Sequence, residues 1–546
     1  LVGAYAFAVW DAPRRALLLA RDHVGLRPLY YHLTPQRLLF ASEIKGLLAA
    51  PDVPRRLNAL QVGYFLSVYV GDNRLTFYED IVRLAPAHTL QVTAAGEEAR
   101  RYWALDPTQA LRLSDAEAAE AFRAQFMEAV QARLRSAFPA AVLLSGGLDS
   151  SSVAVAAQAL QAQAGQLPLA TVSATYPRVT AADESAYIDA VLATGQFTSH
   201  RVAMDAVSPL GDAERVQWLG DEPVMSPTFY IAWNLMRAAA QQGARVVLDG
   251  VDGDTTVSHG NAYLAELARA GRWADFAREA QALAGHEGLA PVAQSIHQYG
   301  LPYLRELARD WRWGAFRRGV DGLATHLAVP RGYLWRNYGL RSAVPPGLLQ
   351  AWRRARGKTA VARPARPTLV RADFARQHGL AERMAEPETA VASARADHFV
   401  TLSSNLLPSA FELADRAATA FGVESRHPFA DRRLMALCLA LPGEQKLRDG
   451  WVRYVLRQAM AGLLPDVVRW RGGKTRNSPA FTDSLIRFEQ ARLDAMLQTP
   501  PEELRPFVDM AALAEMYRRY RRHADPQDEM LVWQAATLAM WLQSAW

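Results

Sequence analysis

Residues 141–153 read AVLLSGGLDSSSV, an apolar run that breaks at Ser145-Gly146-Gly147 and continues with a helix-like pattern. A strand that ends in two glycines lets successive backbone N–H groups converge on an anion, and the N-terminus of the following helix adds its positive dipole end. Asp149 would place a carboxylate beside the bound oxygens, where Mg²⁺ could bridge protein and polyphosphate. The alternative is an ordinary strand-to-helix turn, because Ser and Asp are common N-caps. The glycines, the carboxylate and three consecutive serines together favour a nucleotide phosphate site.

A second β-like run, residues 246–254, reads VVLDGVDGD and ends in three carboxylates separated by glycines. Asp149 and Asp254, at the ends of two strands, could hold one Mg²⁺ across the phosphates. The alternatives are a solvated acidic turn and a calcium loop. The calcium-loop pattern fails because Thr255 follows Asp254 and no glutamate closes the expected frame.

A third segment, residues 468–475, reads VRWRGGKT. Its end resembles a Walker A loop, but Val468 stands where the first glycine is needed, so that interpretation fails. Lysine occurs only at positions 45, 358, 446 and 474, whereas 57 of the 61 basic residues are arginine. We therefore expect Lys474 to stabilise negative charge that develops on phosphate and on a tetrahedral carbon. An exposed loop lysine is the alternative.

The predicted elements place these segments on one sheet. Residues 1–105 are β-rich, with a helix at 57–65, and Ser114 begins a capping box for a long helix that reaches about residue 137. Beyond it, predicted strands alternate with helices, which favours an α/β fold with a doubly wound parallel sheet. The strands are 141–144, 169–174, 201–204 and 245–248, and the helices are 150–163, 184–194 and 230–241. Ligands in such sheets bind beyond the carboxyl ends of strands, where Ser145 and Asp249 both fall.

Helical periodicity dominates from about residue 261 to the end of the chain, and we expect no internal repeat. Residues 363–367 (RPARP) predict a surface loop. Residues 412–431 hold closely spaced charges that predict a buried ion-pair network or a site for a substrate carboxylate, with structural pairing favoured. Residues 310–318 (DWRWGAFRR) predict aromatic packing with solvated arginines, or a surface for an acidic or nucleic-acid partner. The Trp-rich end, residues 532–546, predicts a packed terminal helix.

The composition limits which classes of protein are possible. The chain has 546 residues, a formal net charge of +6 and 50% hydrophobic residues, which suits two or more globular domains and does not by itself indicate nucleic acid. No apolar stretch approaches about 18 residues, so no membrane span is expected. The single cysteine, Cys438, lies in an apolar setting, which predicts a buried thiol and a cytoplasmic location. The first residues, LVGAYAFAVW, lack the marks of a signal peptide, and we expect the chain to be a fragment that begins inside a domain.

SGGLDSS resembles the pyrophosphate-binding loop of the ATP pyrophosphatase (PP-loop) superfamily, which cleaves ATP to AMP and pyrophosphate. Other segments narrow the resemblance to the asparagine synthetase family. Residues 1–11 (LVGAYAFAVWD), 21–31 (RDHVGLRPLYY) and 40–45 (FASEIK) are similar to the second half of its N-terminal glutamine amidotransferase domain. Residues 422–431 (GVESRHPFAD) and the Lys474 loop are similar to its helical lobe. The resemblance implies a partial α+β amidotransferase domain of the N-terminal-nucleophile type at 1–113. An ATP-binding amide synthetase domain at 114–546 follows, with its PP-loop core at 114–260 and its helical region at 261–546.

The resemblance also implies site residues and cofactors. ATP and Mg²⁺ are the expected cofactors, with Asp149 and Asp254 as the magnesium carboxylates. Lys474 falls at the family's catalytic lysine, and Arg453 lies near a second cation of the site. The residues implied to bind the nucleotide are Leu144, Ser145, Gly146, Gly147, Leu148, Asp149, Ser150, Ser151, Asp249 and Gly250.

Two departures from the family pattern concern the substrates. The N-terminal nucleophilic cysteine and the upstream glutamine-binding motifs are not in this sequence, so glutamine hydrolysis cannot be assigned to these residues. The family usually reads SGEGSDE where this chain has DGVDGDT at 249–255, so Val251 replaces a glutamate of the acceptor side and Thr255 replaces the last one.

The implied reaction is ATP-dependent amide-bond formation through an acyl-adenylate, of the asparagine synthase (glutamine-hydrolysing) type. The acid would be aspartate or a peptide carboxylate, and the amine would be glutamine-derived ammonia or a peptide N-terminus. A lasso-peptide isopeptide cyclase or related macrolactam synthetase is the runner-up. A noncatalytic nucleotide-binding regulatory homologue is a third alternative, and the joint presence of Asp149, Asp254 and Lys474 argues against it. No nucleic-acid partner is expected, because no zinc-type cysteine cluster or separate basic module is present. A homodimer is compatible with the sequence.

Overall fold

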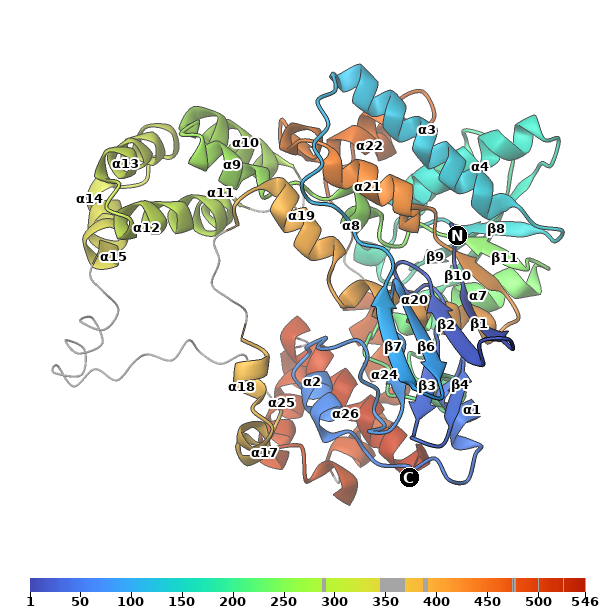
Figure 1. Cartoon of the computed structure of the whole chain (residues 1–546). Coiled ribbons are helices and arrows are strands. Elements are labelled where there is room, and N and C mark those ends of the chain that lie inside the picture. Colours follow the sequence, from blue (N-terminus) through green and yellow to red (C-terminus); the bar gives the residue numbers. More distant parts are fainter. Residues whose placement is uncertain are drawn as a thin grey trace.

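The N-terminal residues form two small antiparallel sheets. In this computed structural model, which describes residues 1–286, 291–343, 369–385, 391–473, 475, 478–498, 500–523 and 525–545, they lie beside the main body (Figure 1). One sheet has the order β1-β2-β6-β7, and the other has the order β4-β3-β5. Their strands are β1 (Ala6–Asp11), β2 (Ala16–Arg21), β3 (Tyr30–Leu33), β4 (Leu38–Ala41), β5 (Val82–Arg83), β6 (His88–Thr93) and β7 (Gly96–Arg101). The β-rich character predicted for residues 1–105 is confirmed, and the helix expected at 57–65 is α2 (Ala59–Leu66), which follows α1 (Ile44–Leu48).

A five-stranded parallel sheet of order β10-β9-β8-β11-β12 forms the centre of the molecule. Its strands are β8 (Ala140–Leu143), β9 (Leu169–Thr175), β10 (Phe197–Ala203), β11 (Val246–Leu248) and β12 (Glu424–Arg426). The chain builds outward from β8 through β9 to β10 and then returns to the other side of β8 with β11. The order of strands therefore reverses between β8 and β11, which is where doubly wound sheets bind ligands. The predicted parallel sheet is confirmed, and β12 is an additional strand.

Helices pack around this sheet as its strand order requires. α3 (Asp115–Leu134) precedes β8 and begins with the predicted capping box, in which Ser114 and Glu117 exchange hydrogen bonds. The connections contain α4 (Leu148–Gln163), α5 (Ser185–Leu192), α6 (Ala213–Gly220) and α7 (Phe229–Gln241). Phe122 and Phe126 of α3 pack with Val142 of β8 and Leu248 of β11 in one buried core. This packing holds the two neighbouring strands in place.

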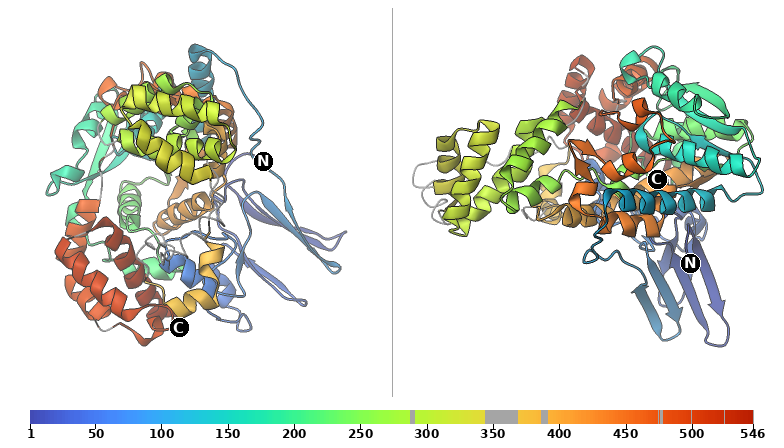
Figure 2. Two further views of the ribbon diagram at one scale, coloured as in Figure 1. Left: turned by 90° about the vertical axis from the view of Figure 1, so that its left-hand side faces the viewer. Right: turned by 90° about the horizontal axis from the view of Figure 1, so that it is seen from above.

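A helical arm projects from the body after β11 (Figures 1 and 2). After α8 (Gly253–Val257), the arm contains α9 (Tyr263–Arg269), α10 (Trp273–Gly285), α11 (Val292–Ser295), α12 (Leu301–Arg309), α13 (Trp313–Leu327), α14 (Arg331–Leu334) and α15 (Arg341–Ala343). π-helical turns at Ile296–Gly300 and Trp335–Leu340 follow α11 and α14. The same order of helices thus occurs twice, and the expectation of no internal repeat is wrong.

The C-terminal helices pack against the N-terminal sheets and α7. The remaining helices are α17 (Ala372–Gln377), α18 (Leu380–Arg383), α19 (Ala394–Leu402), α20 (Leu406–Thr419), α21 (Arg432–Ala440), α22 (Tyr454–Ala459), α23 (Asp466–Arg469), α24 (Ser478–Gln498), α25 (Met510–His523) and α26 (Pro526–Ala545). Trp533 and Trp541 of α26 are buried, which confirms the predicted packed terminal helix. Cys438 is a buried free thiol, also as predicted. The loop expected at 363–367 lies outside the described residues. Within the described part of the chain, no helix is both long and apolar enough to cross a lipid bilayer.

A buried ion-pair network joins the N-terminal sheets to α20. Glu412 of α20 pairs with Arg83 at 3.3 Å, with Arg416 at 3.2 Å and with Arg21 at 3.6 Å. Tyr30 also donates a hydrogen bond to Glu412. Burial alone would raise the pKa of Glu412, but the three guanidinium groups hold it well below its usual value. The structural-pairing hypothesis for residues 412–431 is confirmed for this glutamate.

Candidate functional site

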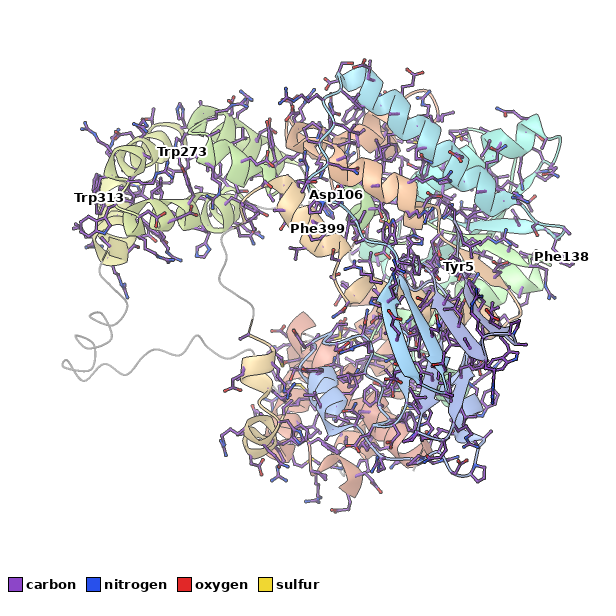
Figure 3. All side chains as sticks on the ribbon, viewed as in Figure 1. Tyr5, Asp106, Phe138, Trp273, Trp313 and Phe399 are labelled. Atoms are coloured by element: carbon purple, nitrogen blue, oxygen red, sulfur yellow. The ribbon has the colours of Figure 1, made fainter. Side chains whose placement is uncertain are left out.

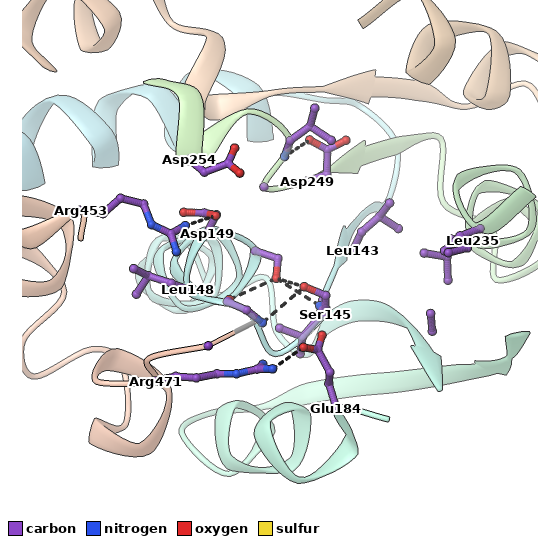
Figure 4. A pocket seen from close by; sticks show the side chains of 18 of the residues that line it. Leu143, Ser145, Leu148, Asp149, Glu184, Leu235, Asp249, Asp254, Arg453 and Arg471 are labelled. Carbon is purple, nitrogen blue, oxygen red and sulfur yellow. Dashed lines mark hydrogen bonds and ion pairs between the residues drawn. The ribbon is translucent and has the colours of Figure 1, made fainter. Parts of the chain in front are cut away.

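A cavity of about 400 Å³ opens at the carboxyl ends of β8 and β11, at the point where the strand order reverses (Figure 4). Segments distant in the sequence meet there, because β8 and β11 are neighbours in the sheet. Its wall is formed by Leu143, Leu144, Ser145, Gly147, Leu148, Asp149, Ser150, Ala174, Tyr176, Glu184, Ile231, Leu235, Asp249, Gly250, Val251, Asp254, His259, Val452, Arg453, Arg471, Gly472 and Gly473. The two sequence motifs predicted to share a sheet edge do share one.

The loop between β8 and α4 presents backbone donors to this cavity. Gly147 is the N-cap residue of α4, and having no side chain it supplies no cap for the first helical turn. The Ser150 hydroxyl accepts from the Ser145 backbone N–H at 3.1 Å, and the two serine hydroxyls lie 2.8 Å apart. The N–H groups of the first turn therefore have no side-chain cap, and the residues that carry them, 148–150, line the cavity. This arrangement suits an anionic ligand such as phosphate.

Glycines allow the two loops to approach each other. Gly146 has a φ of +72°, and a Cβ there would also lie 2.8 Å from Cβ of Tyr187. A Cβ on Gly250 would lie 2.4 Å from the backbone nitrogen of Ser150, and one on Gly253 would lie 2.6 Å from Cγ of Asp149. The β11 loop thus packs directly on the start of α4, and these positions require glycine.

Carboxylates and an arginine gather at the start of α4. Arg453 donates to Oδ2 of Asp149 at 2.5 Å, and within the described residues Oδ1 of Asp149 is buried without a hydrogen-bond partner. Figure 4 shows Asp254 beside this pair. Mg²⁺ is commonly bound by one or two carboxylates together with substrate phosphates and water. Asp149 and Asp254 fit that role, and the described residues contain no cluster of three or more His, Cys, Asp or Glu side chains that would hold a metal by itself.

Two further aspartates shape the β11 loop. Buried Asp249 accepts from the Val251 backbone N–H at 3.1 Å, and its Oδ1 lies 2.8 Å from Nδ1 of buried His427. Burial, and next the charge of Asp254, raises the pKa of Asp252 to about 7. Asp249 therefore fixes the turn, and an added cation near Asp254 would favour ionisation of Asp252.

The structure brings together most of the residues expected at the site. Leu144, Ser145, Gly147, Leu148, Asp149, Ser150, Asp249, Gly250, Asp254 and Arg453 all line the cavity. Gly146 and the fully buried Ser151 do not line it. Lys474 lies outside the described residues, although Gly472 and Gly473 before it line the cavity. The roles of these residues stay predictions.

Several lining residues were missed by sequence reasoning. Arg471 pairs with Glu184 at 2.5 Å and reaches the carbonyl of Gly146 at 3.4 Å, so it ties the Lys474 loop to the phosphate loop. Arg471 stands three positions before Lys474, a signal that could have been used, since a basic residue beside a predicted catalytic lysine has the same access to the site. Glu184, Tyr176 and His259 gave no comparable signal, because each acquires its neighbours only through the tertiary fold.

The sequence model of the family described as "Asparagine synthase" matches residues 121–543, which include every segment of this cavity. The chain belongs to the asparagine synthase family. A second family model, described as "Glutamine amidotransferase domain", matches residues 1–103. The α/β architecture of the described residues agrees with this membership.

Similar proteins carry different names. The chain is 35% identical over 179 residues to asparagine synthetase [glutamine-hydrolyzing] 3 of Bacillus subtilis, a match that covers 32% of this chain and 29% of the relative. It is 30% identical over 280 residues to amidase chyE of Penicillium rubens, covering 49% of this chain and 41% of the relative. Amidase chry2 of Gibberella zeae is 31% identical over 268 residues, covering 46% and 39%. The matches thus span less than half the length of each of these three relatives.

Proposed function

We propose that this asparagine synthase family member is an ATP-dependent carbon–nitrogen ligase that releases AMP and pyrophosphate. A substrate carboxylate attacks ATP to give an acyl-adenylate and pyrophosphate, and an amine then displaces AMP to form an amide. The observation that carries the proposal is the cavity at the carboxyl ends of β8 and β11, which joins backbone donors, two carboxylates and arginines in one place. This set of groups is suited to holding a polyphosphate and opposing developing negative charge.

The position of each residue in the cavity indicates its proposed role. The first turn of α4 and the Ser145–Ser150 pair would hold phosphate oxygens. Asp149 and Asp254 would hold Mg²⁺, which when bound neutralises phosphate charge. Arg471 braces the loop through Glu184, and Arg453 orients Asp149. Lys474 is proposed as the cation for the charge that develops on phosphate and carbonyl carbon.

We expect the acid substrate to bind in the part of the cavity near Val251. Val251 lines the cavity and also packs against an apolar cluster that includes Leu26, Phe411 and Met435. An apolar side chain there offers no charge to the amino or carboxylate groups of a small amino acid. Aspartate with glutamine-derived ammonia remains the first proposal. The apolar wall favours as second candidate a macrolactam synthetase that joins a peptide carboxylate to a peptide N-terminus.

ATP–pyrophosphate exchange tests the proposal. Exchange that depends on an added acid is expected from the full chain, with free aspartate and peptides that carry Asp or Glu side chains as the competing acids. Asp149→Ala should abolish the exchange, whereas Asp11→Ala, at a partly exposed aspartate that does not line the cavity, should leave it unchanged. Absence of exchange with every acid, in a folded protein that binds ATP, would overturn the ligase proposal and favour a nucleotide-binding homologue.

A further inference from the structure

The arm consists of two copies of one helical unit. Residues 264–284 read LAELARAGRWADFAREAQALA and residues 304–324 read LRELARDWRWGAFRRGVDGLA, so 11 of 21 positions are identical at a spacing of 40. Trp273 and Trp313 occupy the same place in the two units, at the starts of α10 and α13 (Figure 3). The apolar residues that the two units share pack into one core. This core contains Phe276 and Phe316 together with the equivalent leucines Leu264, Leu267, Leu304 and Leu307. Stacked units of this kind bury each other's faces, and the last unit has a face left over.

The corner between the two helices differs between the units at one position. Gly271 and Trp311 are equivalent, and both adopt a left-handed backbone, with φ of +73° and +58°. A glycine adopts this conformation freely, whereas a bulky residue there is strained. Trp311 is nevertheless 68% exposed, and among the described aromatic rings it contacts that of Trp313, at 5.9 Å between ring centroids. The packing of the fold does not explain why a tryptophan stands at this corner, and such an outlier points to a function.

The charged residues around that corner also differ between the two units. In the first unit, Arg272 and Arg278 both pair with Asp275 at 2.7 Å. Ala315 replaces this aspartate in the second unit, and within the described residues Arg312 and Arg318 form no ion pair. The loss of one carboxylate therefore leaves two exposed arginines on the segment that carries the exposed tryptophan.

The stacking of the two units also distinguishes a third arginine, Arg309, from its equivalent in the first unit. Arg269 of the first unit binds Glu306 of the second unit through two hydrogen bonds of 2.8 and 2.6 Å. Arg309 is the equivalent of Arg269, and its carboxylate would have to come from a further unit. Residues 344–368, which follow in the sequence, contain no Asp or Glu. The chain therefore supplies no acidic residue in that segment for Arg309, Arg312 or Arg318.

The second unit is also more basic than the first. Residues 304–343 contain eight arginines and three carboxylates, a net charge of +5, whereas residues 264–303 contain three arginines and four carboxylates. The whole chain has a net charge of +6. A second copy of the chain would be repelled by this surface, and an acidic partner would be attracted.

We propose that Arg309, Trp311, Arg312 and Arg318 form a docking site for an acidic segment of another protein. Carboxylates of that segment take the place of the Asp275 and Glu306 carboxylates of the first unit, and an apolar side chain packs on the Trp311 ring. Tryptophan and arginine are the residues that most often anchor protein interfaces. The docking site is independent of the proposed ligase activity, because it requires neither ATP nor the cavity.

The root of the arm borders the reaction cavity, whereas the docking site lies further out on the arm (Figure 1). Leu447 and Val452, on the hairpin of β13 (Leu447–Arg448) and β14 (Trp451–Val452), belong to the core of the arm, and Val452 also lines the cavity. Gly450 of the same hairpin donates to Glu279 of α10 at 3.0 Å. His259, four residues before α9, is a further lining residue. One continuous piece of structure thus connects the docking site to the cavity.

Substitutions that copy the first unit test the proposal without disturbing the fold. Trp311→Gly removes the ring and suits the left-handed backbone, and Ala315→Asp restores the internal partner of Arg312 and Arg318. Binding to the full chain is measured by fluorescence anisotropy with a labelled peptide of Glu-Glu-Glu-Leu repeats, at low salt. We expect the double variant W311G/A315D to bind this peptide about tenfold more weakly, with an unchanged or raised melting temperature. Arg312→Gln/Arg318→Gln should give a similar loss.

Matched controls distinguish binding at the docking site from nonspecific attraction of the peptide to positive charge. Trp218→Ala removes an equally exposed tryptophan, at 66%, from α6, and Arg518→Gln removes one positive charge from α25. Both should bind the peptide as the unsubstituted chain does. Equal peptide affinity in W311G/A315D would overturn the proposal. So would tighter binding of a labelled oligothymidine that is lost in the same variant, because the surface would then serve a nucleic acid. A failure of ATP–pyrophosphate exchange leaves this binding result intact, so the two proposals fail separately.

Discussion

Arg453 donates to the carboxylate of Asp149 at 2.5 Å, although 304 positions separate the two residues in the chain. Arg453 adopts a left-handed backbone, with φ of +55°, directly after the hairpin that packs on the arm. An arginine in this conformation is held by its surroundings rather than by its own preference. The ion pair thus connects the helical half of the chain to the first turn of α4.

The pair predicts that Arg453 acts through Asp149. Arg453→Met should lower the rate of ATP–pyrophosphate exchange by about a hundredfold, because one preorganised cation is lost from the site. Asp149→Asn should remove most activity by itself, and the double variant should be no worse than Asp149→Asn alone. Arg518→Met, at an exposed arginine of α25, is the control. Fully additive losses in the double variant would contradict a shared action of the two residues.

Gly250 predicts how tightly the two loops must fit. A Cβ at this position would lie 2.4 Å from the backbone nitrogen of Ser150, so Gly250→Ala must displace the phosphate loop. We expect ATP to bind at least about tenfold more weakly, as measured by calorimetry, because loop N–H groups lose their alignment. Gly220→Ala serves as the control, since no atom lies within 4 Å of a Cβ there. Equal ATP affinity in both variants would show that the loops do not form the nucleotide site.

Glu412 predicts a large contribution to stability from the domain interface. Glu412→Gln leaves Arg21, Arg83 and Arg416 close together without the carboxylate that they share. Breaking a buried charge network in this way typically lowers the free energy of unfolding by about 3–5 kcal/mol. Asp11→Asn, which breaks an exposed pair with Arg14, should leave the urea midpoint unchanged. A similar midpoint for Glu412→Gln would show that the network is not needed at the interface.

The elements that sequence reasoning found are those with a local cause. The Ser114 capping box, the apolar strands β8 and β9 and the glycine turn before α4 each follow from residues next to one another. Strand β12 was missed because its sequence, Glu-Ser-Arg, is short and polar, and only pairing with β11 makes it a strand. The repeat in the arm could have been predicted from the sequence, because 11 of 21 positions are identical at a spacing of 40, but it was overlooked. The Arg471–Glu184 pair depends on the tertiary fold and has no local signature.

Lys446 predicts a pH dependence of stability. Its side chain is fully buried, and Nζ donates to Nδ1 of His398 at 2.9 Å. Nε2 of His398 lies 3.0 Å from the Thr255 carbonyl oxygen, so the ring carries its proton on Nε2. Burial, and next the charge of Lys446, holds the pKa of His398 well below its usual value, which keeps the ring neutral as the acceptor. Burial also lowers the pKa of Lys446 from 10.5 to about 8.

The sign of the effect follows from proton binding. Between about pH 8 and pH 10.5 the unfolded chain keeps a proton on Lys446 that the folded chain releases, so the stability contributed by this group rises with pH. Lys446→Met removes this contribution. The variant should therefore gain stability relative to the unsubstituted chain near pH 7 and lose about 2 kcal/mol of that advantage by about pH 10. Urea unfolding at several pH values measures the difference, with Lys45→Met as control because that side chain is 26% exposed. Parallel pH profiles for the Lys446→Met variant and the unsubstituted chain would show that the lysine keeps its proton in the folded state.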